Sequence, residues 1–350
     1  MRIAELAALR HFTVREGARP PAPPPGWVQV QVRYAGICGS DIHYFSEGGV
    51  GPAKCSYPQI LGHEPTGIIT ELGPGVSGWQ VGDPVLCEPA IYCYHCEFCL
   101  SGRHNVCSNI RFMSTPVEPG YFRDLVNVPA INLMAPPKGV GLAEAVLFEP
   151  LAIVLHSMTF AAPSLGDTAL VYGAGPIGLL TVAVLKMSGV GRIWCIDPVA
   201  HRRDMARTLG ADVVFDPTQV DVVKTILHDT GQRGVDIAID CATPDPALGC
   251  DTINECIRAA RNAGRVVITG IPGVLSYPLD IHALRVKELY FYTVRRSNHE
   301  TAAGVRLLEQ YPALLGPVVT HQRPVEQIND TFLMVEHHQD RVGKAVVSFD

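Results

Sequence analysis

The chain has 350 residues, of which 47% are apolar and 18% charged, with a formal charge of -6 and an isoelectric point near 6.1. This length predicts about two domains of ordinary size, and the composition excludes a disordered chain and a small disulfide-stapled scaffold. No block of Lys and Arg could face a nucleic-acid backbone, so we expect no nucleic-acid partner. No segment has the pattern of a signal peptide or a membrane span, so we expect a cytoplasmic protein that does not bind a membrane.

The first 150 residues alternate short Val- and Ile-rich runs with Gly and Pro, the pattern of antiparallel strands joined by loops. We expect an all-β region, with strands at 28–33, 66–71 and 84–87. Residues 290–350 mix both patterns and are too few for a third domain, so they are expected to rejoin this first half.

From about residue 166, apolar runs alternate with segments of helical periodicity, which predicts a parallel sheet covered by helices in a doubly wound α/β domain. Gly210 and Gly264 are placed to end two of these helices. Strands are expected at 168–172, 192–196, 213–215, 235–239 and 265–269, and helices at 177–187, 200–209 and 252–260.

A glycine motif, Gly173-Ala-Gly175-Pro-Ile-Gly178, directly follows a predicted strand and opens a predicted helix. In this context the glycines allow a tight turn, close approach of a pyrophosphate and packing of helix on strand. Asp197 ends the next strand, where its carboxylate can accept hydrogen bonds from ribose hydroxyls, which favours NAD; Arg202 and Arg203 keep NADP as the alternative. The expected cofactor contacts are Gly173, Gly175, Pro176, Ile177, Gly178, Asp197 and Arg202.

Four cysteines lie within fifteen residues, at Cys93, Cys96, Cys99 and Cys107. Four thiolates at this spacing can surround a tetrahedral zinc ion and leave no open position, which is typical of a structural site. An iron–sulfur cluster is the alternative, and the compact spacing favours zinc. The remaining cysteines lie in apolar or helical contexts and are expected to be packing residues.

A looser set comprises Cys38, His63, Glu64 and Glu149. Each residue alone is compatible with an ordinary buried side chain. Brought together, Cys, His and a carboxylate could supply three protein ligands and leave one coordination position open, as a catalytic zinc requires.

Together these motifs resemble those of the zinc-dependent medium-chain dehydrogenases, and they are most similar to the sorbitol (polyol) dehydrogenase branch. The resemblance covers nearly the whole chain and includes 36–44, 62–67, the four-cysteine segment, 149–156 and the glycine motif. It implies a Rossmann cofactor domain at 152–289, inserted into a chaperonin-10-like β-barrel catalytic domain. That catalytic domain would comprise 1–151, with a structural-zinc lobe at 87–110, and 290–350.

The resemblance also implies two zinc ions per chain, a structural one at the four cysteines and a catalytic one on Cys38, His63 and Glu64. Glu149 would stand beside the catalytic ion, as a ligand or through a water molecule. Because one thiolate and one carboxylate already neutralise Zn²⁺, we expect Glu149 to hold the water.

The roles of five further residues are carried over from the family. Ser40 is expected to accept the proton of the alcohol and His43 to pass it on, although a helix cap is the alternative for Ser40. Tyr44, Phe112 and Arg295 match pocket positions that would contact a polyhydroxy substrate.

The implied reaction is oxidation of a secondary alcohol of a polyol or sugar acid to a ketone, with hydride transfer to NAD. L-Threonine 3-dehydrogenase and butanediol or other secondary alcohol dehydrogenases are the alternatives, and Glu149-Pro-Leu favours the polyol branch. Zinc-free quinone reductase-like and crystallin relatives lack the cysteine lobe. The chain departs from the sorbitol enzymes at Arg296, where they usually carry an aromatic residue. A homo-oligomer, a tetramer or a dimer, is also implied.

Overall fold

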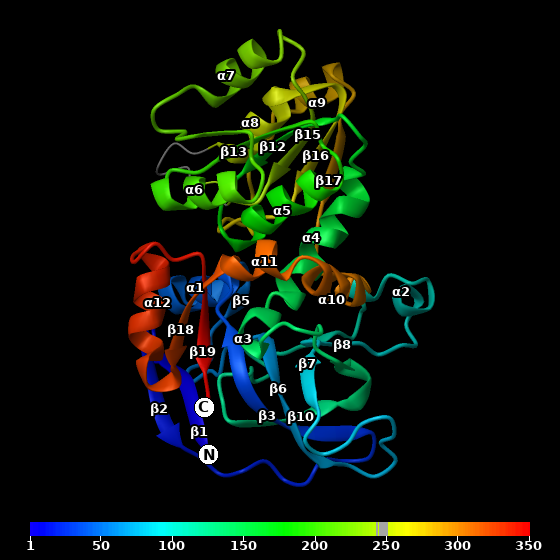
Figure 1. Cartoon of the computed structure of the whole chain (residues 1–350), viewed down its shortest axis with the longest axis vertical. Coiled ribbons are helices and arrows are strands. Elements are labelled where there is room, and N and C mark those ends of the chain that lie inside the picture. Colours follow the sequence, from blue (N-terminus) through cyan, green and yellow to red (C-terminus); the bar gives the residue numbers. More distant parts are fainter. Residues whose placement is uncertain (243, 245–250) are drawn as a thin grey trace. The chain divides into compact units, whose positions relative to one another are not determined.

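The computed structural model describes residues 1–242, 244 and 251–350. The chain divides into two compact units, described separately below and labelled in Figure 1. Unit 1 contains Met1–Glu149 and Thr301–Asp350, and unit 2 contains Pro150–Glu300. The chain was expected to return to the first unit at residue 290, whereas it does so at Thr301. The reason is that strand β17 (Tyr290–Thr293) pairs with β16 (Ala260–Ile268) in the sheet of unit 2.

Unit 1 is built on a seven-stranded sheet with the order β11-β7-β6-β3-β19-β18, in which β10 also pairs with β3. The central strands β3 (Trp27–Gly36) and β6 (Glu64–Leu72) run antiparallel, and they bring Gly36 opposite Glu64. Strand β19 (Lys344–Ser348) pairs antiparallel with β3 and parallel with β18 (Val319–Pro324). The last strand of the chain therefore completes the sheet in which β3 is the first strand in sequence.

The other elements of unit 1 are the remaining strands of this sheet, further short strands, and helices. Its first half is not all-β as expected, because helix α1 (Gly39–Glu47) begins directly after β3. Cys38 and Asp41 form a capping box there, and such a cap gives the following residues a helical start. The others are β1(Arg2–Ala8), β2(His11–Glu16), β4(Gly49–Val50), β5(Ala53–Lys54), β7(Pro84–Cys87), β8(Ala90–Ile91), α2(Glu97–Leu100), β9(Arg111–Phe112), β10(Leu125–Pro129), β11(Leu133–Met134), α3(Leu142–Ala145), α10(Thr301–Gln310), α11(Pro312–Leu315) and α12(Ile328–Glu336), with 3-10 turns at His104–Val106, Ala130–Asn132, Gly316–Val318 and Val325–Gln327.

The core of unit 1 joins the beginning and the end of the chain. Phe12 of β2 and Phe45 of α1 both pack against Phe332 of α12, with ring centroids 4.6 and 5.2 Å apart. All three side chains are buried, and aromatic pairs at such distances add to the stabilisation from buried apolar area. The return of the chain is therefore fixed by packing as well as by strand pairing.

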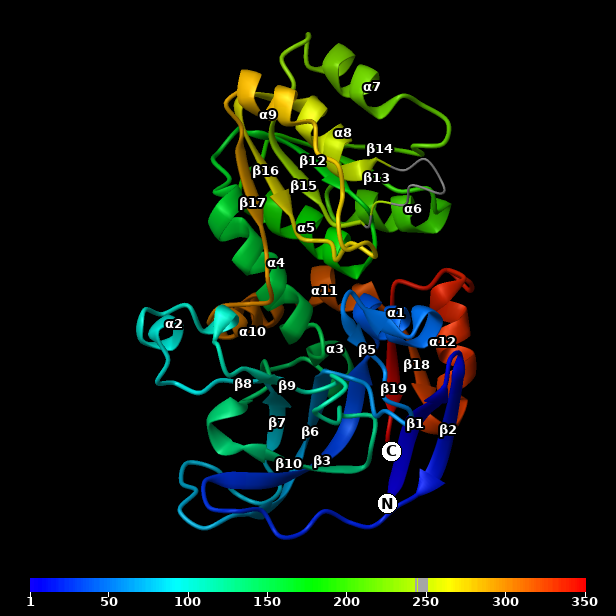
Figure 2. The ribbon, with the colours of Figure 1, turned by 180° about the vertical axis from the view of Figure 1, so that it is seen from behind.

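Unit 2 contains a six-stranded sheet with the order β14-β13-β12-β15-β16-β17, in which every neighbouring pair is parallel. Figures 1 and 2 show α5 and α6 on one face of it and α7, α8 and α9 on the other, which confirms the doubly wound prediction. Its elements are β12(Thr168–Tyr172), α5(Pro176–Met187), β13(Arg192–Ile196), α6(Ala200–Thr208), β14(Val213–Phe215), α7(Val222–Asp229), β15(Val235–Asp240), α8(Thr252–Ala259), β16(Ala260–Ile268), α9(Ile281–Val286) and β17.

The two glycines expected to end helices differ in outcome. Gly210 follows α6 with a φ of 112°, the left-handed conformation of a helix stop, so this prediction is confirmed. The prediction for Gly264 is wrong, because α8 already ends at Ala259 and Gly264 lies inside β16. The register of β16 against β15 shifts here, between Ala260 and Arg265. A glycine inside a strand often marks such an irregularity.

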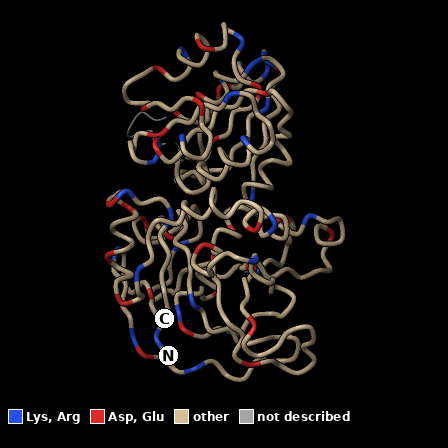
Figure 3. Tube along the Cα trace, viewed as in Figure 1, with Lys and Arg blue, Asp and Glu red and all other residues tan. Residues whose placement is uncertain are grey.

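Helix α4 (Phe148–Ala161) carries the chain from one unit into the other. The apolar stretch Leu142–Ala161, which includes it, is long enough by length and composition to cross a membrane. Because 67% of the tested window is buried, the stretch is typical of a core helix. Lys and Arg are interspersed with Asp and Glu along the trace in Figure 3, so the formal charge is spread over the described chain.

Candidate metal and cofactor sites

The first candidate site lies where β3 and β6 meet in unit 1. Cys38 follows β3 and caps α1, His63 directly precedes β6, and Glu64 is the first residue of β6. The pairing of Gly36 with Glu64 brings these segments together, and the ligand atoms of the three residues lie within 4.8 Å of one another. His63 and Glu64 are buried. A partly buried thiol together with a buried imidazole and carboxylate at this separation fits one zinc ion with a remaining open position.

Asp41 contacts both Cys38 and His63, and it was not assigned a role from the sequence. Its side chain is fully buried; one oxygen accepts a hydrogen bond from the Cys38 amide (3.1 Å), and the other lies 3.4 Å from His63 Nδ1. Burial alone would raise the pKa of Asp41, but His63 and the hydrogen-bond donors hold it below its usual value. A carboxylate on Nδ1 leaves Nε2 of His63 to face a metal ion.

Lys344 of β19 was also missed. It is 1% exposed, and its ammonium group contacts both carboxylate oxygens of Glu64. Burial lowers the pKa of Lys344, but Glu64 and Cys38 outweigh this effect and raise it above its ordinary value. The sequence contains one signal for this lysine: it stands directly before the apolar run 345–347, and a buried lysine in such a strand requires a charged partner.

Glu149 is the second residue of α4 and is buried in unit 1. The structure does not bring it into the group whose ligand atoms lie within 4.8 Å of one another. Burial raises the pKa of Glu149 to about 8, with His63 opposing the shift and Glu64 adding to it. A carboxyl group in this state can carry a proton near neutral pH.

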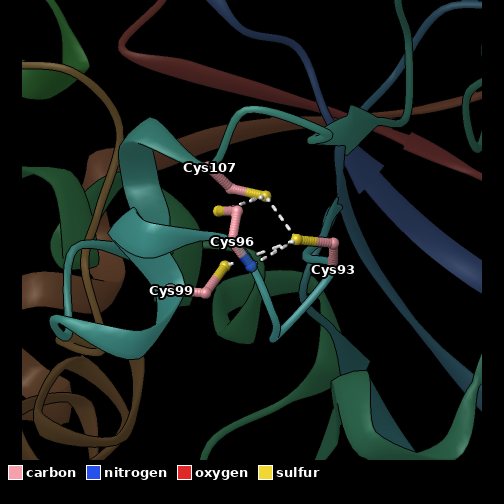
Figure 4. A group of neighbouring side chains, drawn as sticks. All are labelled: Cys93, Cys96, Cys99 and Cys107. Atoms are coloured by element: carbon pink, nitrogen blue, oxygen red, sulfur yellow. Dashed lines mark hydrogen bonds between the residues drawn. The ribbon is translucent and has the colours of Figure 1, made fainter.

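The four cysteines form the second candidate site, shown in Figure 4, where their sulfur atoms turn toward one another. The Sγ atoms of Cys93 and Cys107 are 3.5 Å apart, and the pairs Cys93–Cys99 and Cys96–Cys107 are each 3.9 Å apart. Four zinc–sulfur bonds of about 2.3 Å in a tetrahedron place the sulfurs roughly 3.8 Å apart. The group therefore fits a fully thiolate-bound zinc ion.

The thiols of this group have unequal acidity. Backbone amides lower the pKa of Cys93 to about 5, and they also lower that of Cys96. Burial raises the pKa of Cys99 to about 12. Thiolate character at Cys93 and Cys96 favours capture of a metal ion, which then displaces the remaining protons.

The glycine motif forms the third candidate site, within unit 2. Gly173 has a φ of 92°, and a Cβ on Gly178 would lie 1.8 Å from the Gly173 carbonyl oxygen. A Cβ on Gly175, the residue before α5, would meet no atom within 4 Å. The turn thus requires glycine at two positions and leaves open space at the third, where the pyrophosphate of a dinucleotide fits against a helix N-terminus.

Asp197, directly after β13, is attached to this turn. Its carboxylate accepts hydrogen bonds from the amides of Ala174 (2.7 Å) and Val199 (2.8 Å). The guanidinium of Arg203 donates to the Asp197 carbonyl and pairs with Asp216, whereas Arg202 is half-buried and burial lowers its pKa. The carboxylate, rather than either arginine, is therefore fixed beside the turn.

The other expected site residues are placed as follows. Ser40 and His43 both lie on α1, and His43 Nδ1 is 2.8 Å from Glu47 Oε1. The ring of Phe112 stands 5.4 Å from that of His63, centroid to centroid. Tyr44 is buried in α1, and Arg295 follows β17 in unit 2.

Outside the two metal-binding groups, the described cysteines are consistent with packing roles. Burial raises the pKa of Cys87, Cys195 and Cys256, and it raises that of Cys241 to about 12. Neutral buried thiols behave as small apolar side chains. Cys250, for which the same role was expected, lies outside the described residues.

Comparison with known proteins gives matches over both units. The alcohol dehydrogenase GroES-like domain matches residues 24–138, and the zinc-binding dehydrogenase domain matches 176–310. An L-threonine 3-dehydrogenase of Pyrococcus horikoshii is 36% identical over 306 residues, covering 86% of this chain and 85% of the relative. The sorbitol dehydrogenase of Bacillus subtilis is 31% identical over 303 residues, covering 87% and 84%.

A solved structure from Escherichia coli CFT073, described as a short chain alcohol dehydrogenase complexed with NADH, has a TM-score of 0.88 at 29% identity, covering 100% of this chain and 99% of that one. The GroES-like and zinc-binding matches agree with the two folds and the two groups of candidate zinc ligands described above. The chain therefore belongs to the zinc-dependent alcohol dehydrogenase family, the medium-chain dehydrogenases, and is an NAD(P)-linked, zinc-dependent dehydrogenase.

Proposed function

We propose that this protein oxidises a secondary alcohol of a polyol or sugar acid to a ketone and transfers the hydride to NAD. The observation that carries the proposal is the group of Cys38, His63 and Glu64, with buried Glu149 in the same unit. Zinc at this group supplies a Lewis acid that makes an alcohol more acidic and a carbonyl more polarised. In this proposal the four cysteines hold a second, structural zinc ion.

Four residues handle the proton and the substrate. Ser40 stands two positions after Cys38, and its hydroxyl makes no hydrogen bond within the part of the chain that the structure describes, so it is available to accept the alcohol proton. His43 then transfers the proton toward solvent through Glu47, which is 2.8 Å away and half exposed. Glu149 holds a water molecule or a substrate hydroxyl.

The cofactor preference follows from Asp197. Its carboxylate is fixed at the glycine turn, where it can accept hydrogen bonds from the two ribose hydroxyls of NAD. The 2′-phosphate of NADP would meet that negative charge, and Arg203 is already paired with Asp216. We therefore propose NAD as the preferred cofactor, with Arg202 at the edge of its site.

The second candidate function is oxidation of L-threonine, because the threonine relatives match this chain as well as the polyol relatives do. Threonine carries a carboxylate two carbons from the reacting alcohol. Beside the group of Cys38, His63 and Glu64, the ammonium group of Lys344 is committed to Glu64. This arrangement favours a substrate that carries hydroxyls, rather than a charged group, beside the reacting carbon, with Tyr44, Phe112 and Arg295 as its further contacts.

The test is the initial rate of NAD reduction with polyols, sugar acids, 2,3-butanediol, simple secondary alcohols and L-threonine, each repeated with NADP and after metal chelation. Elemental analysis of the same preparation counts zinc, with two ions per chain expected. A chelator-sensitive rate that is highest for polyols or sugar acids supports the proposal. A rate that is highest for threonine leaves the metal and cofactor sites intact and overturns the substrate.

Assembly, location and domain extent belong to the same proposal. Strand β17 is an edge of the unit 2 sheet, and the segment that precedes it in sequence carries exposed Leu275, Ile281 and Val286; both features support a homo-oligomer built through this edge. The thiol-rich metal group supports a reducing, cytoplasmic location. Sedimentation velocity of the purified protein tests the oligomer, and a monomer at micromolar concentration would contradict it.

A further inference from the structure

Ser114 occupies an unusual position in unit 1. It is 3% exposed, and its φ of 76° lies in the left-handed region that a residue with a Cβ rarely adopts. Residues in this region persist where the surrounding structure holds them, and they are concentrated at functional sites.

The turn around Ser114 is held from several directions. Its amide donates to the Glu118 carbonyl (3.0 Å), and the Thr115 hydroxyl donates to the Phe112 carbonyl (2.8 Å). Arg111 forms an ion pair with Glu118 across the turn. The short strand β9, which enters the turn, pairs with β8. None of these contacts involves Cys38, His63 or Glu64, so the position of the Ser114 hydroxyl does not depend on the candidate metal ligands.

The Ser114 hydroxyl points at Asp41, the carboxylate that contacts the candidate metal ligands. Ser114 Oγ donates to Asp41 Oδ1 at 3.0 Å, and this same oxygen lies 3.4 Å from His63 Nδ1 and accepts from the Gly62 amide at 3.3 Å. The second oxygen of Asp41 accepts from the Cys38 amide. Asp41 therefore joins three chain segments, and among the described residues Ser114 supplies the hydroxyl from which it accepts a hydrogen bond.

We propose that Ser114 is a positioning residue for the metal group: its hydroxyl fixes the rotation of the Asp41 carboxylate, which fixes the His63 ring. Without the hydroxyl, the carboxylate keeps the hydrogen bonds from the Cys38 amide (3.1 Å) and from the Gly62 amide (3.3 Å), of which the second is long. The Oδ1 atom of Asp41 is then held less tightly, and its contact with His63 Nδ1 loosens. Outer partners that orient a ligand typically change metal affinity 10- to 100-fold. Because Ser114 acts one contact further out, we expect about a 3- to 10-fold faster release of zinc.

Two variants separate the hydroxyl from the backbone. Ser114→Ala and Ser114→Gly both remove the hydroxyl, but glycine adopts the left-handed conformation readily and alanine does not. If Ser114→Ala does not fold, Ser114→Gly still tests the hydroxyl, because glycine adopts the left-handed conformation without strain. The matched control is Thr331→Val, which removes from helix α12 of the same unit a buried hydroxyl that donates to the carbonyl of Gln327, the residue before that helix.

The measurement is the rate of zinc transfer from the holoenzyme to a chromogenic chelator. The phase that is absent from a His63→Ala protein is assigned to the Cys38 group, and the remaining phase to the four cysteines. We expect both Ser114 variants to accelerate the first phase by similar factors, and to leave the second phase unchanged. In cobalt-substituted protein, the visible absorption bands of the first site should shift in both variants.

Three results would overturn the inference: unchanged release in both variants, acceleration in Ser114→Ala that glycine abolishes, or equal acceleration in Thr331→Val. The inference rests on the proposed zinc site, and the two can fail separately. If the wild-type protein releases only the zinc of the four cysteines, the proposed function fails. If it releases both ions and the Ser114 variants match it, only the role of Ser114 fails.

Discussion

The buried ion pair between Lys344 and Glu64 gives the sharpest prediction. Replacing Lys344 with Met keeps most of the side-chain volume but leaves the Glu64 carboxylate, which is fully buried, without its cation. Removing one partner of such a pair typically costs about 3–5 kcal/mol in the free energy of unfolding. We expect this full loss in zinc-free protein, and a smaller loss in zinc-loaded protein because the metal ion compensates the same carboxylate.

The assay is urea unfolding followed by tryptophan fluorescence in a Trp194→Phe background, in which Trp27 and Trp79 report on unit 1. The double variant Lys344→Met/Glu64→Gln removes both charges and should regain most of the lost stability. A loss below about 1 kcal/mol in zinc-free protein, or a double variant as unstable as the single one, would refute the reasoning.

Three further predictions concern separate parts of the molecule. Cys107→Ser should lower the zinc content from two ions to one per chain and lower the melting temperature, as measured by elemental analysis and calorimetry; two retained ions would contradict the four-thiolate site. Burial raises the pKa of Asp240 to about 7, so between about pH 4 and 7 folded unit 2 binds more protons than the unfolded chain. The free energy of unfolding of unit 2 should therefore fall as the pH rises through that window, by up to about 4 kcal/mol. Asp240→Asn should flatten this dependence in urea titrations of the zinc-loaded protein, whereas an unchanged slope would mean that the carboxyl titrates normally. Ser40→Ala should reduce kcat by about 100-fold or more with little change in KM, whereas Ser40→Thr should retain most activity; equal rates in all three proteins would remove the hydroxyl from the proton path.

Features that depend on local sequence were predicted from the chain alone. The strands of unit 2 appear as apolar runs because both faces of its parallel sheet are covered by helices. The glycine turn could be recognised in the sequence because its backbone allows only glycine at positions 173 and 178, so the motif itself records the turn. The grouping of Cys38 with His63 came from the family resemblance rather than from local sequence, and in the structure the pairing of β3 with β6 brings their ligand atoms close together.

Features that depend on distant contacts were not predicted. Lys344 meets Glu64 across 280 positions of sequence, and no periodicity within either strand encodes that contact. Gly264 carried the pattern of a helix stop, yet the pairing of β16 with β15 placed it within a strand. Asp41 was within reach of sequence analysis, since it stands three residues after Cys38, the spacing of a capping box.

The position of β19 between β3 and β18 has a consequence for biosynthesis. At about 5–20 residues per second, Lys344 follows the end of β3 out of the ribosome by roughly 15–60 s. Unit 2 is contiguous in sequence and can close on itself during that interval, whereas residues 34–36 of β3 still lack their partner strand β19 and Glu64 has no cation. The nascent first unit is therefore the part of this chain most exposed to aggregation, and the part for which chaperone protection during synthesis matters most.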